Sequence, residues 1–188
     1  MLNRYSIFAA LLICFSACQS TQSGSSETPT TSSPEISSCV RGEAQPALDS
    51  TGLSQYSFTM LDSVNAEERW TLPNGDQWII RHLGCEYFVI EYELRTQRHA
   101  TPLSDTTTWT EHALEFTLAL AEVDTSPMHM ETAAAQLETL AQSGDVLQPN
   151  IPLTLVPGEI QEVMQLSELS QDSTGTVTLR LVFAIGPL

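Results

Sequence analysis

The stretch RWTLPNGDQWIIR, residues 69 to 81, decides the expected fold. Two runs rich in aromatic and β-branched residues, Arg69 to Leu72 and Gln77 to Arg81, flank a turn from Pro73 to Asp76. An Asn followed by Gly tolerates the positive φ angles of a tight turn. The stretch therefore predicts a β-hairpin.

Further strands are predicted on both sides of this hairpin, because apolar residues recur there with a period of two. The expected strands are Tyr56 to Met60, Cys85 to Leu94, Ile160 to Leu169 and Thr176 to Ile185, with an extended stretch from Ile151 to Val156. In the strand that follows Cys85, Ile90, Tyr92 and Leu94 share one face, and Glu91 and Glu93 share the other. We expect the face that carries the carboxylates to be exposed.

The middle of the chain predicts two helices. Thr108 with Glu111 has the pattern of a capping box, and apolar residues at helical spacing follow it, so the first helix is expected to end near Asp124. The second is expected to begin at Ser126 and Pro127 and to end at Gly144.

The order of strands, two helices and strands predicts an α+β fold. We expect an antiparallel β-sheet with two short helices packed on one face. The alternative is a β-barrel with a helical insertion.

The N-terminus has the order of an export signal. Arg4 is followed by an apolar run from Ile7 to Phe15, and Ser16 and Ala17 precede Cys18. These residues resemble the lipobox of bacterial lipoproteins, which implies acylation of Cys18 and a lipid bilayer as its partner. An ordinary secretory signal cut nearby is the alternative. Gln19, where Asp would favour inner-membrane retention in that family, implies the outer membrane, facing the periplasm.

The chain accordingly divides into three parts. Residues 1–17 are the expected signal peptide. Residues 18–38 are the lipidated Cys18 and a Ser/Thr-rich tether too polar to build a core. Residues 39–188 have the length of a single domain.

Cys39 and Cys85 are the two cysteines left beside Cys18 in the expected mature chain. In an oxidising compartment an even pair most simply forms a disulfide. A redox-active or metal-binding pair is the alternative, but the Cys-x-x-Cys spacing that lowers a thiol pKa is absent from the sequence.

The formal net charge is −16, and every basic residue is Arg. Nucleic acid is therefore excluded as an expected partner. A negative field attracts cationic proteins, so a cationic protein partner is one interpretation of the charge. Solubility in the surrounding medium is the other.

Short catalytic motifs for phosphate binding, serine hydrolysis and zinc proteolysis are absent from the sequence, so we assign no catalytic residue, metal or cofactor. The four histidines, His82, His99, His112 and His129, stand apart from one another in the sequence. Three weaker patterns remain, each with a structural alternative.

Met128, His129 and Met130 offer copper(I) ligands or, alternatively, core packing with the imidazole in solvent. His112 and Glu115 share a helix face but lack a third ligand, which favours a solvated face. Glu91 and Glu93, near Glu86, suggest paired carboxylates for acid–base work or an exposed sheet face.

The residues Asn74 to Asp76 and Leu83 to Tyr87 resemble a hairpin of uncharacterised exported bacterial proteins, which carries no assigned activity. From these observations we expect a membrane-anchored periplasmic lipoprotein with a non-enzymatic binding or envelope-associated domain. One alternative, by likeness of class and charge, is an inhibitor of a cationic lysozyme-type enzyme. Another is a cell-wall or peptide-acting enzyme with a non-local active site.

Overall fold

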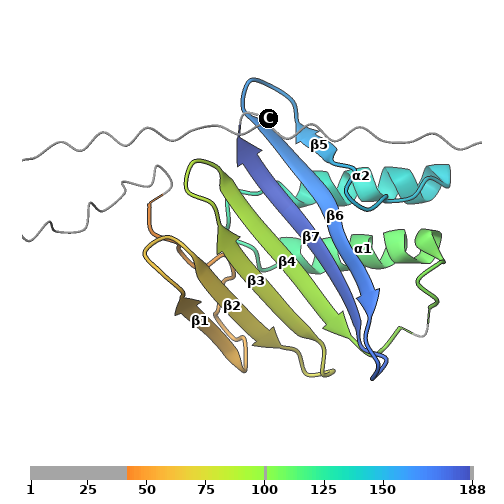
Figure 1. The fold of residues 1–188 in the computed structure, drawn as a ribbon, viewed down its shortest axis with the longest axis horizontal. Coiled ribbons are helices and arrows are strands. Elements are labelled where there is room, and N and C mark those ends of the chain that lie inside the picture. The colour runs from red at the N-terminus through yellow and green to blue at the C-terminus, as the bar shows by residue number, and fades with distance from the viewer. Residues whose placement is uncertain (1–41, 100, 187–188) are drawn as a thin grey trace, which may run out of the picture. The chain divides into compact units, whose positions relative to one another are not determined.

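The computed structural model describes residues 42–99 and 101–186. Within these ranges, seven antiparallel strands form one open sheet in the order β1-β2-β3-β4-β7-β6-β5 (Figure 1). The elements are β1 (Tyr56–Met60), β2 (Ala66–Thr71), β3 (Gln77–Leu83), β4 (Phe88–Thr96), α1 (Thr106–Ala121), α2 (Met130–Ser143), β5 (Leu153–Val156), β6 (Gln161–Gln171) and β7 (Val177–Gly186).

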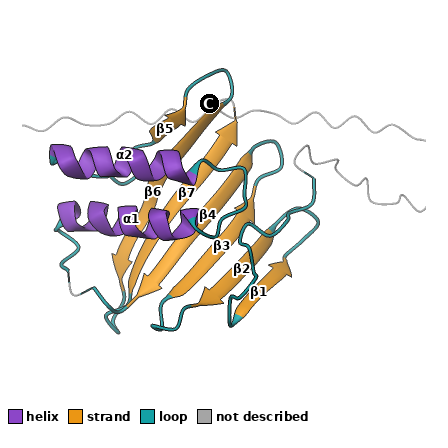
Figure 2. Ribbon diagram, turned by 180° about the vertical axis from the view of Figure 1, so that it is seen from behind, coloured by secondary structure: helices purple, strands orange, loops and turns teal. Residues whose placement is uncertain are grey.

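The prediction of an α+β fold with an antiparallel sheet is confirmed. Both helices lie on the same side of the sheet (Figure 2). The alternative of a barrel is wrong, because the described strands form an open sheet that begins at β1 and ends at β5.

The β2–β3 hairpin is present, and Trp70 pairs with Trp78 across it. Its turn differs in detail from the expectation, since Gly75 has a φ of 90° but Asn74 is not among the residues with positive φ. The side chain of Asn74 instead accepts a hydrogen bond of 3.0 Å from the backbone N–H of Asp76. Only the glycine therefore provides the left-handed conformation.

Both helices begin at residues other than those predicted. Asp105 is the N-cap of α1, and its side chain accepts a 3.1 Å hydrogen bond from the backbone N–H of Thr108, so the predicted capping box is wrong. For α2 the N-cap is His129. Ser126 lies three residues before this N-cap, and its hydroxyl donates a 2.6 Å hydrogen bond to the carboxylate of Asp124. The predicted C-cap is confirmed, since Gly144 has a left-handed φ of 77°.

The hydrophobic core lies between the helices and one face of the sheet. Alternate residues of β3, β4 and β7 supply its sheet side, and α1 and α2 supply its other side. Its members include Trp78, Ile80, Ile90, Tyr92, Leu94, Ala113, Phe116, Leu120, Ala133, Leu137, Leu179, Leu181 and Phe183. The strict alternation predicted for β7 is confirmed by Val177, Leu179, Leu181 and Phe183, which are all buried.

Cys85 lies in the bend between β3 and β4 and is partly buried. Cys18 and Cys39 lie outside the described residues, as do the expected signal peptide and tether. The lipidation and the Cys39–Cys85 disulfide stay predictions.

Candidate metal centre

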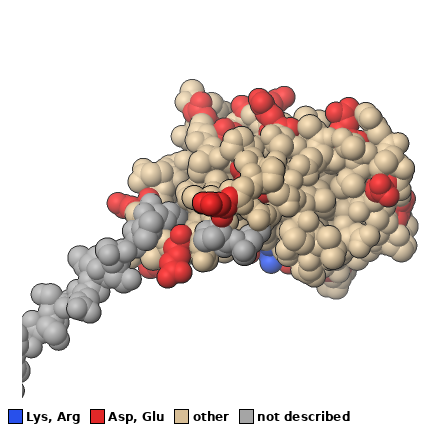
Figure 3. Space-filling view, turned by 90° about the horizontal axis from the view of Figure 1, so that it is seen from above, with Lys and Arg blue, Asp and Glu red and all other residues tan. Residues whose placement is uncertain are grey.

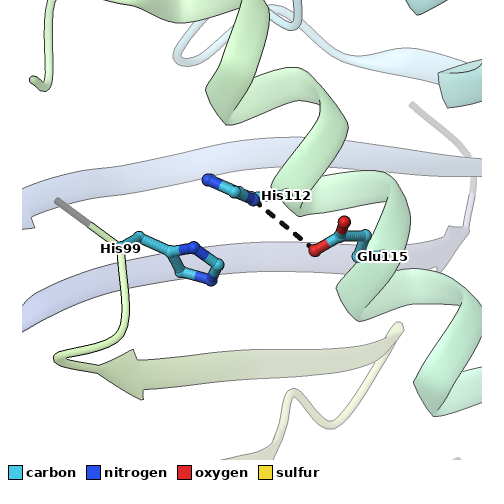
Figure 4. Close-up of side chains that lie close together, drawn as sticks. All are labelled: His99, His112 and Glu115. Carbon is cyan, nitrogen blue, oxygen red and sulfur yellow. Dashed lines mark ion pairs between the residues drawn. The ribbon is translucent and has the colours of Figure 1, made fainter. Parts of the chain in front are cut away.

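His99, His112 and Glu115 lie together between the end of β4 and the helix α1 (Figure 4). His99 belongs to the loop that follows β4, whereas His112 and Glu115 are three residues apart on α1. Residues at this spacing share a helix face, so the helix brings the imidazole and the carboxylate together by itself. The loop adds the third side chain.

The ligand atoms of the three side chains are within reach of a single ion. Each offers one ligand atom, and these atoms all lie within 4.8 Å of one another. The Nδ1 atom of His112 is 3.5 Å from a carboxylate oxygen of Glu115. The imidazole rings of His99 and His112 have centroids 3.6 Å apart and are tilted by 34°.

Both ring nitrogens of His112 are buried, and Nδ1 has the Glu115 carboxylate as its ion-pair neighbour. Among the described residues, neither of its ring nitrogens has a hydrogen-bond partner. A buried polar atom that makes no hydrogen bond costs about 1–3 kcal/mol. A metal ion between the three side chains would accept a lone pair of one nitrogen and remove part of this cost.

The loop that carries His99 is anchored on α1. The indole N–H of Trp109 donates a 3.0 Å hydrogen bond to the carbonyl oxygen of Pro102. The indole ring also contacts both imidazoles edge to face, at centroid distances of 6.0 Å from His99 and 5.0 Å from His112. Trp109 therefore holds the loop against the helix next to the two histidines.

The electrostatics of the site favour a neutral imidazole at His99. Burial lowers the pKa of His99, and the nearby His112 and Arg98 lower it further, against the opposing effects of Glu115 and Asp76. The neutral form is the one that binds metal ions.

A cavity of about 110 Å³ adjoins the three side chains. Trp78, Leu94 and Phe116 give it an apolar wall, and Asp76 and Arg98 give it a charged one. The Nε atom of Arg98 donates a 2.7 Å hydrogen bond to the buried carboxylate of Asp76. The arrangement is a small cavity with an apolar wall on one side and an ion pair with the three candidate ligands on the other.

His99 and His112 stand apart in the sequence but lie together in the structure. The pair His112 and Glu115 was expected to lack a third ligand, and the structure places His99 beside it. Twelve residues, which include the loop before α1, separate the two histidines in the sequence. The sequence contains no short motif for such a site, because the loop conformation sets the distance.

Met128 and Met130 belong to the hydrophobic core, being only 7% and 4% exposed. The imidazole of His129 is more than half exposed, and its Nδ1 contacts Glu162 at 2.5 Å. The structure thus agrees with core packing of the two thioethers and an imidazole near solvent, which was the alternative to a copper(I) site.

Glu93 corrects the expectation of an exposed acidic face. Its side chain is buried on the sheet face opposite the helices, and its carboxylate contacts Arg81 at 2.7 Å, Arg95 at 2.6 Å and Arg180 at 2.8 Å. Burial alone would raise the pKa of Glu93, but hydrogen bonds from these arginines lower it to about 2.

A carboxyl group with so low a pKa stays ionised at neutral pH, so it cannot donate a proton in acid–base catalysis. Glu91 lies on the same strand and is partly exposed. The structure thus gives Glu91 and Glu93 an ion-pair network rather than a catalytic pair.

Comparisons with protein families, curated proteins and solved structures find no match for this chain. Among the described residues, none of the helices combines the length and apolar composition required to cross a membrane.

Proposed function

We propose that this chain is a membrane-anchored lipoprotein of the cell envelope whose domain is a non-enzymatic binding module for a divalent transition-metal ion. His99, His112 and Glu115 are the proposed ligands. The observation that carries the proposal is the convergence of three ligand atoms within 4.8 Å of one another, one of them on an imidazole whose buried nitrogens make no hydrogen bond among the described residues.

The donor set selects the class of ion. Imidazole suits zinc, copper and nickel, whereas calcium and magnesium take mostly oxygen ligands. Two imidazoles with one carboxylate are a frequent ligand set of zinc. We therefore take Zn²⁺ as the representative ion.

Calorimetric titration of the purified protein with Zn²⁺ tests the proposal. We expect one equivalent to bind, and we expect His99→Ala, His112→Ala and Glu115→Ala each to weaken binding strongly. His129→Gln is the control, because it removes an exposed imidazole outside the centre. Equal binding by the wild type and the three variants would refute the proposed site.

The anchor has its own test, which does not depend on the metal. We expect a fatty-acid analogue to label the protein and the label to be lost in Cys18→Ala. Retention of the label in this variant would remove Cys18 as the lipidated residue.

A cationic protein partner is the second candidate. The sequence contains neither Lys nor Arg between His99 and Leu179, a stretch that includes both helices. On the face seen in Figure 3, acidic side chains greatly outnumber basic ones. This distribution supports an inhibitor of a cationic lysozyme-type enzyme, and unchanged lysozyme activity at low salt with micromolar protein would exclude it.

The enzyme alternative would use the same centre. A metal ion with three protein ligands can activate a bound water molecule. Loss of a turnover in His112→Ala, but not in Glu91→Ala, would support an enzyme acting on cell wall or exported peptide.

A further inference from the structure

The charged side chains around the candidate metal centre do not balance a divalent ion. Asp76, Glu115 and Arg98 all line the cavity beside the two histidines. With neutral imidazoles, the two carboxylates and the guanidinium sum to one negative charge. A divalent ion would therefore leave one positive charge in excess, and a small anion bound beside the ion would balance it.

The coordination is also incomplete. His99, His112 and Glu115 offer one ligand atom each, and zinc-like ions take four or more ligands. The cavity of about 110 Å³ lies against these three side chains and can hold a small molecule at the remaining position.

Arg98 is placed to bind a second anion. It lines the same cavity as His99, His112 and Glu115, so it lies close to the centre. Both its Nε and its Nη2 contact the same oxygen of Asp76. A guanidinium has five N–H donors, so this pair leaves donors for another oxygen ligand.

We propose that the metal ion keeps one coordination position open toward this cavity and that the position takes a small carboxylate anion, which Arg98 also binds. This inference rests on the proposed metal-binding function. It adds that the module binds metal and anion together, so that each strengthens the binding of the other.

The test uses the full protein in mild detergent, loaded with Co²⁺, whose visible spectrum depends on its ligands. Acetate is titrated at constant ionic strength, with perchlorate as the balancing anion. We expect a saturable shift of the Co²⁺ bands. We also expect acetate to raise the measured affinity for the metal.

The possible failures are distinct. If the protein gives no Co²⁺ spectrum, or if the spectrum does not change when His112 is replaced, the proposed metal site is refuted. The anion site is then refuted as well. A normal Co²⁺ spectrum that acetate leaves unchanged would overturn only the present inference.

A double variant tests the role of Arg98. Arg98→Gln with Asp76→Asn removes the ion pair, keeps the net charge and leaves no unpaired carboxylate. We expect it to bind Co²⁺ and to lose about tenfold or more in acetate affinity, as for a lost charge-assisted hydrogen bond.

Arg69→Gln with Glu67→Gln is the matched control, since it removes an ion pair on the opposite face of the sheet. Equal acetate affinity in the two double variants would exclude Arg98 from the anion site and overturn that part of the proposal.

Discussion

The Nε2 atom of His82 lies 2.5 Å from a carboxylate oxygen of Glu68, and both side chains are buried in the described domain. Glu68 also accepts hydrogen bonds from the backbone N–H of Ala47 at 2.7 Å and from the hydroxyl of Tyr56 at 2.6 Å. One carboxylate thus joins the segment before β1 to three strands. Burial raises the pKa of Glu68, but these hydrogen bonds outweigh it and lower the pKa.

We expect Glu68→Ala to lower the free energy of unfolding by about 3–5 kcal/mol, because it leaves the partners of a buried charge without an acceptor. Urea denaturation followed by circular dichroism measures this. The matched control is Glu67→Ala on the neighbouring position, where the ion pairs are partly exposed and the expected loss is about 1 kcal/mol or less. Equal losses in both variants would contradict the assigned role of Glu68.

The lowered pKa of Glu93 predicts that the protein loses stability in acid. Its pKa is about 2 in the folded protein, against an ordinary value of 4.5. A lowered pKa gives a contribution that is complete above pH 4.5 and is lost as the pH falls from there toward 2. The difference corresponds to at most about 3 kcal/mol.

Urea midpoints measured between pH 7 and pH 2 should therefore fall more steeply in the wild type than in Glu93→Gln. Glu91→Gln is the control on the same strand, since its nearest ion-pair contact is longer, 3.7 Å, and partly exposed. A Glu93→Gln profile parallel to that of the wild type would show that the arginine cluster does not hold this pKa.

Substitutions at two glycines, Gly75 and Gly84, can separate the cost of a left-handed backbone conformation from the cost of a steric clash. Gly84 and Gly75 have φ angles of 84° and 90°. A Cβ atom on Gly84 would lie 2.5 Å from the carbonyl oxygen of Tyr87, whereas one on Gly75 would meet open space. We expect Gly75→Ala to cost about 1 kcal/mol, the penalty of the left-handed conformation alone.

Gly84→Ala should cost clearly more than Gly75→Ala, because the backbone near Tyr87 must also move. Thermal unfolding of the two variants under identical conditions measures the difference. Equal melting temperatures would mean that the bend before Cys85 accommodates a side chain without strain.

Most of the fold could be predicted because strand periodicity is local. The alternation of Val177, Leu179 and Leu181 fixes the buried face of β7 without any knowledge of its neighbours. The helix starts were harder, because Asp105 and Ser126 compete as capping residues with nearby alternatives. Asp105 caps α1 in place of Thr108, and the hydroxyl of Ser126 bonds to Asp124 instead of capping α2.

The candidate metal centre and the burial of Glu93 depend on contacts across elements. His99 lies beside His112 because contacts such as those of Trp109 hold the loop after β4 against α1. Glu93 is buried because arginines from β3, β4 and β7 converge on it. A period of two shows that Glu93 faces away from the core, but it cannot show what covers that face.

His112 gives the prediction that best separates a metal ligand from a packed side chain. Both its nitrogens are buried without hydrogen-bond partners among the described residues, so His112→Phe keeps an aromatic ring beside His99 and Trp109 and removes that cost. When a chelator removes all metal, we expect the free energy of unfolding of this variant to equal that of the wild type or to exceed it by about 1–2 kcal/mol. With Zn²⁺ at a hundred times its dissociation constant, the free energy of unfolding should rise by about 2.7 kcal/mol in the wild type and stay unchanged in the variant. The wild type should then be the more stable of the two. Urea denaturation with and without Zn²⁺ measures both states. If His112→Phe is strongly destabilised in chelator and Zn²⁺ leaves the wild type unchanged, then His112 is a packing residue and not a metal ligand.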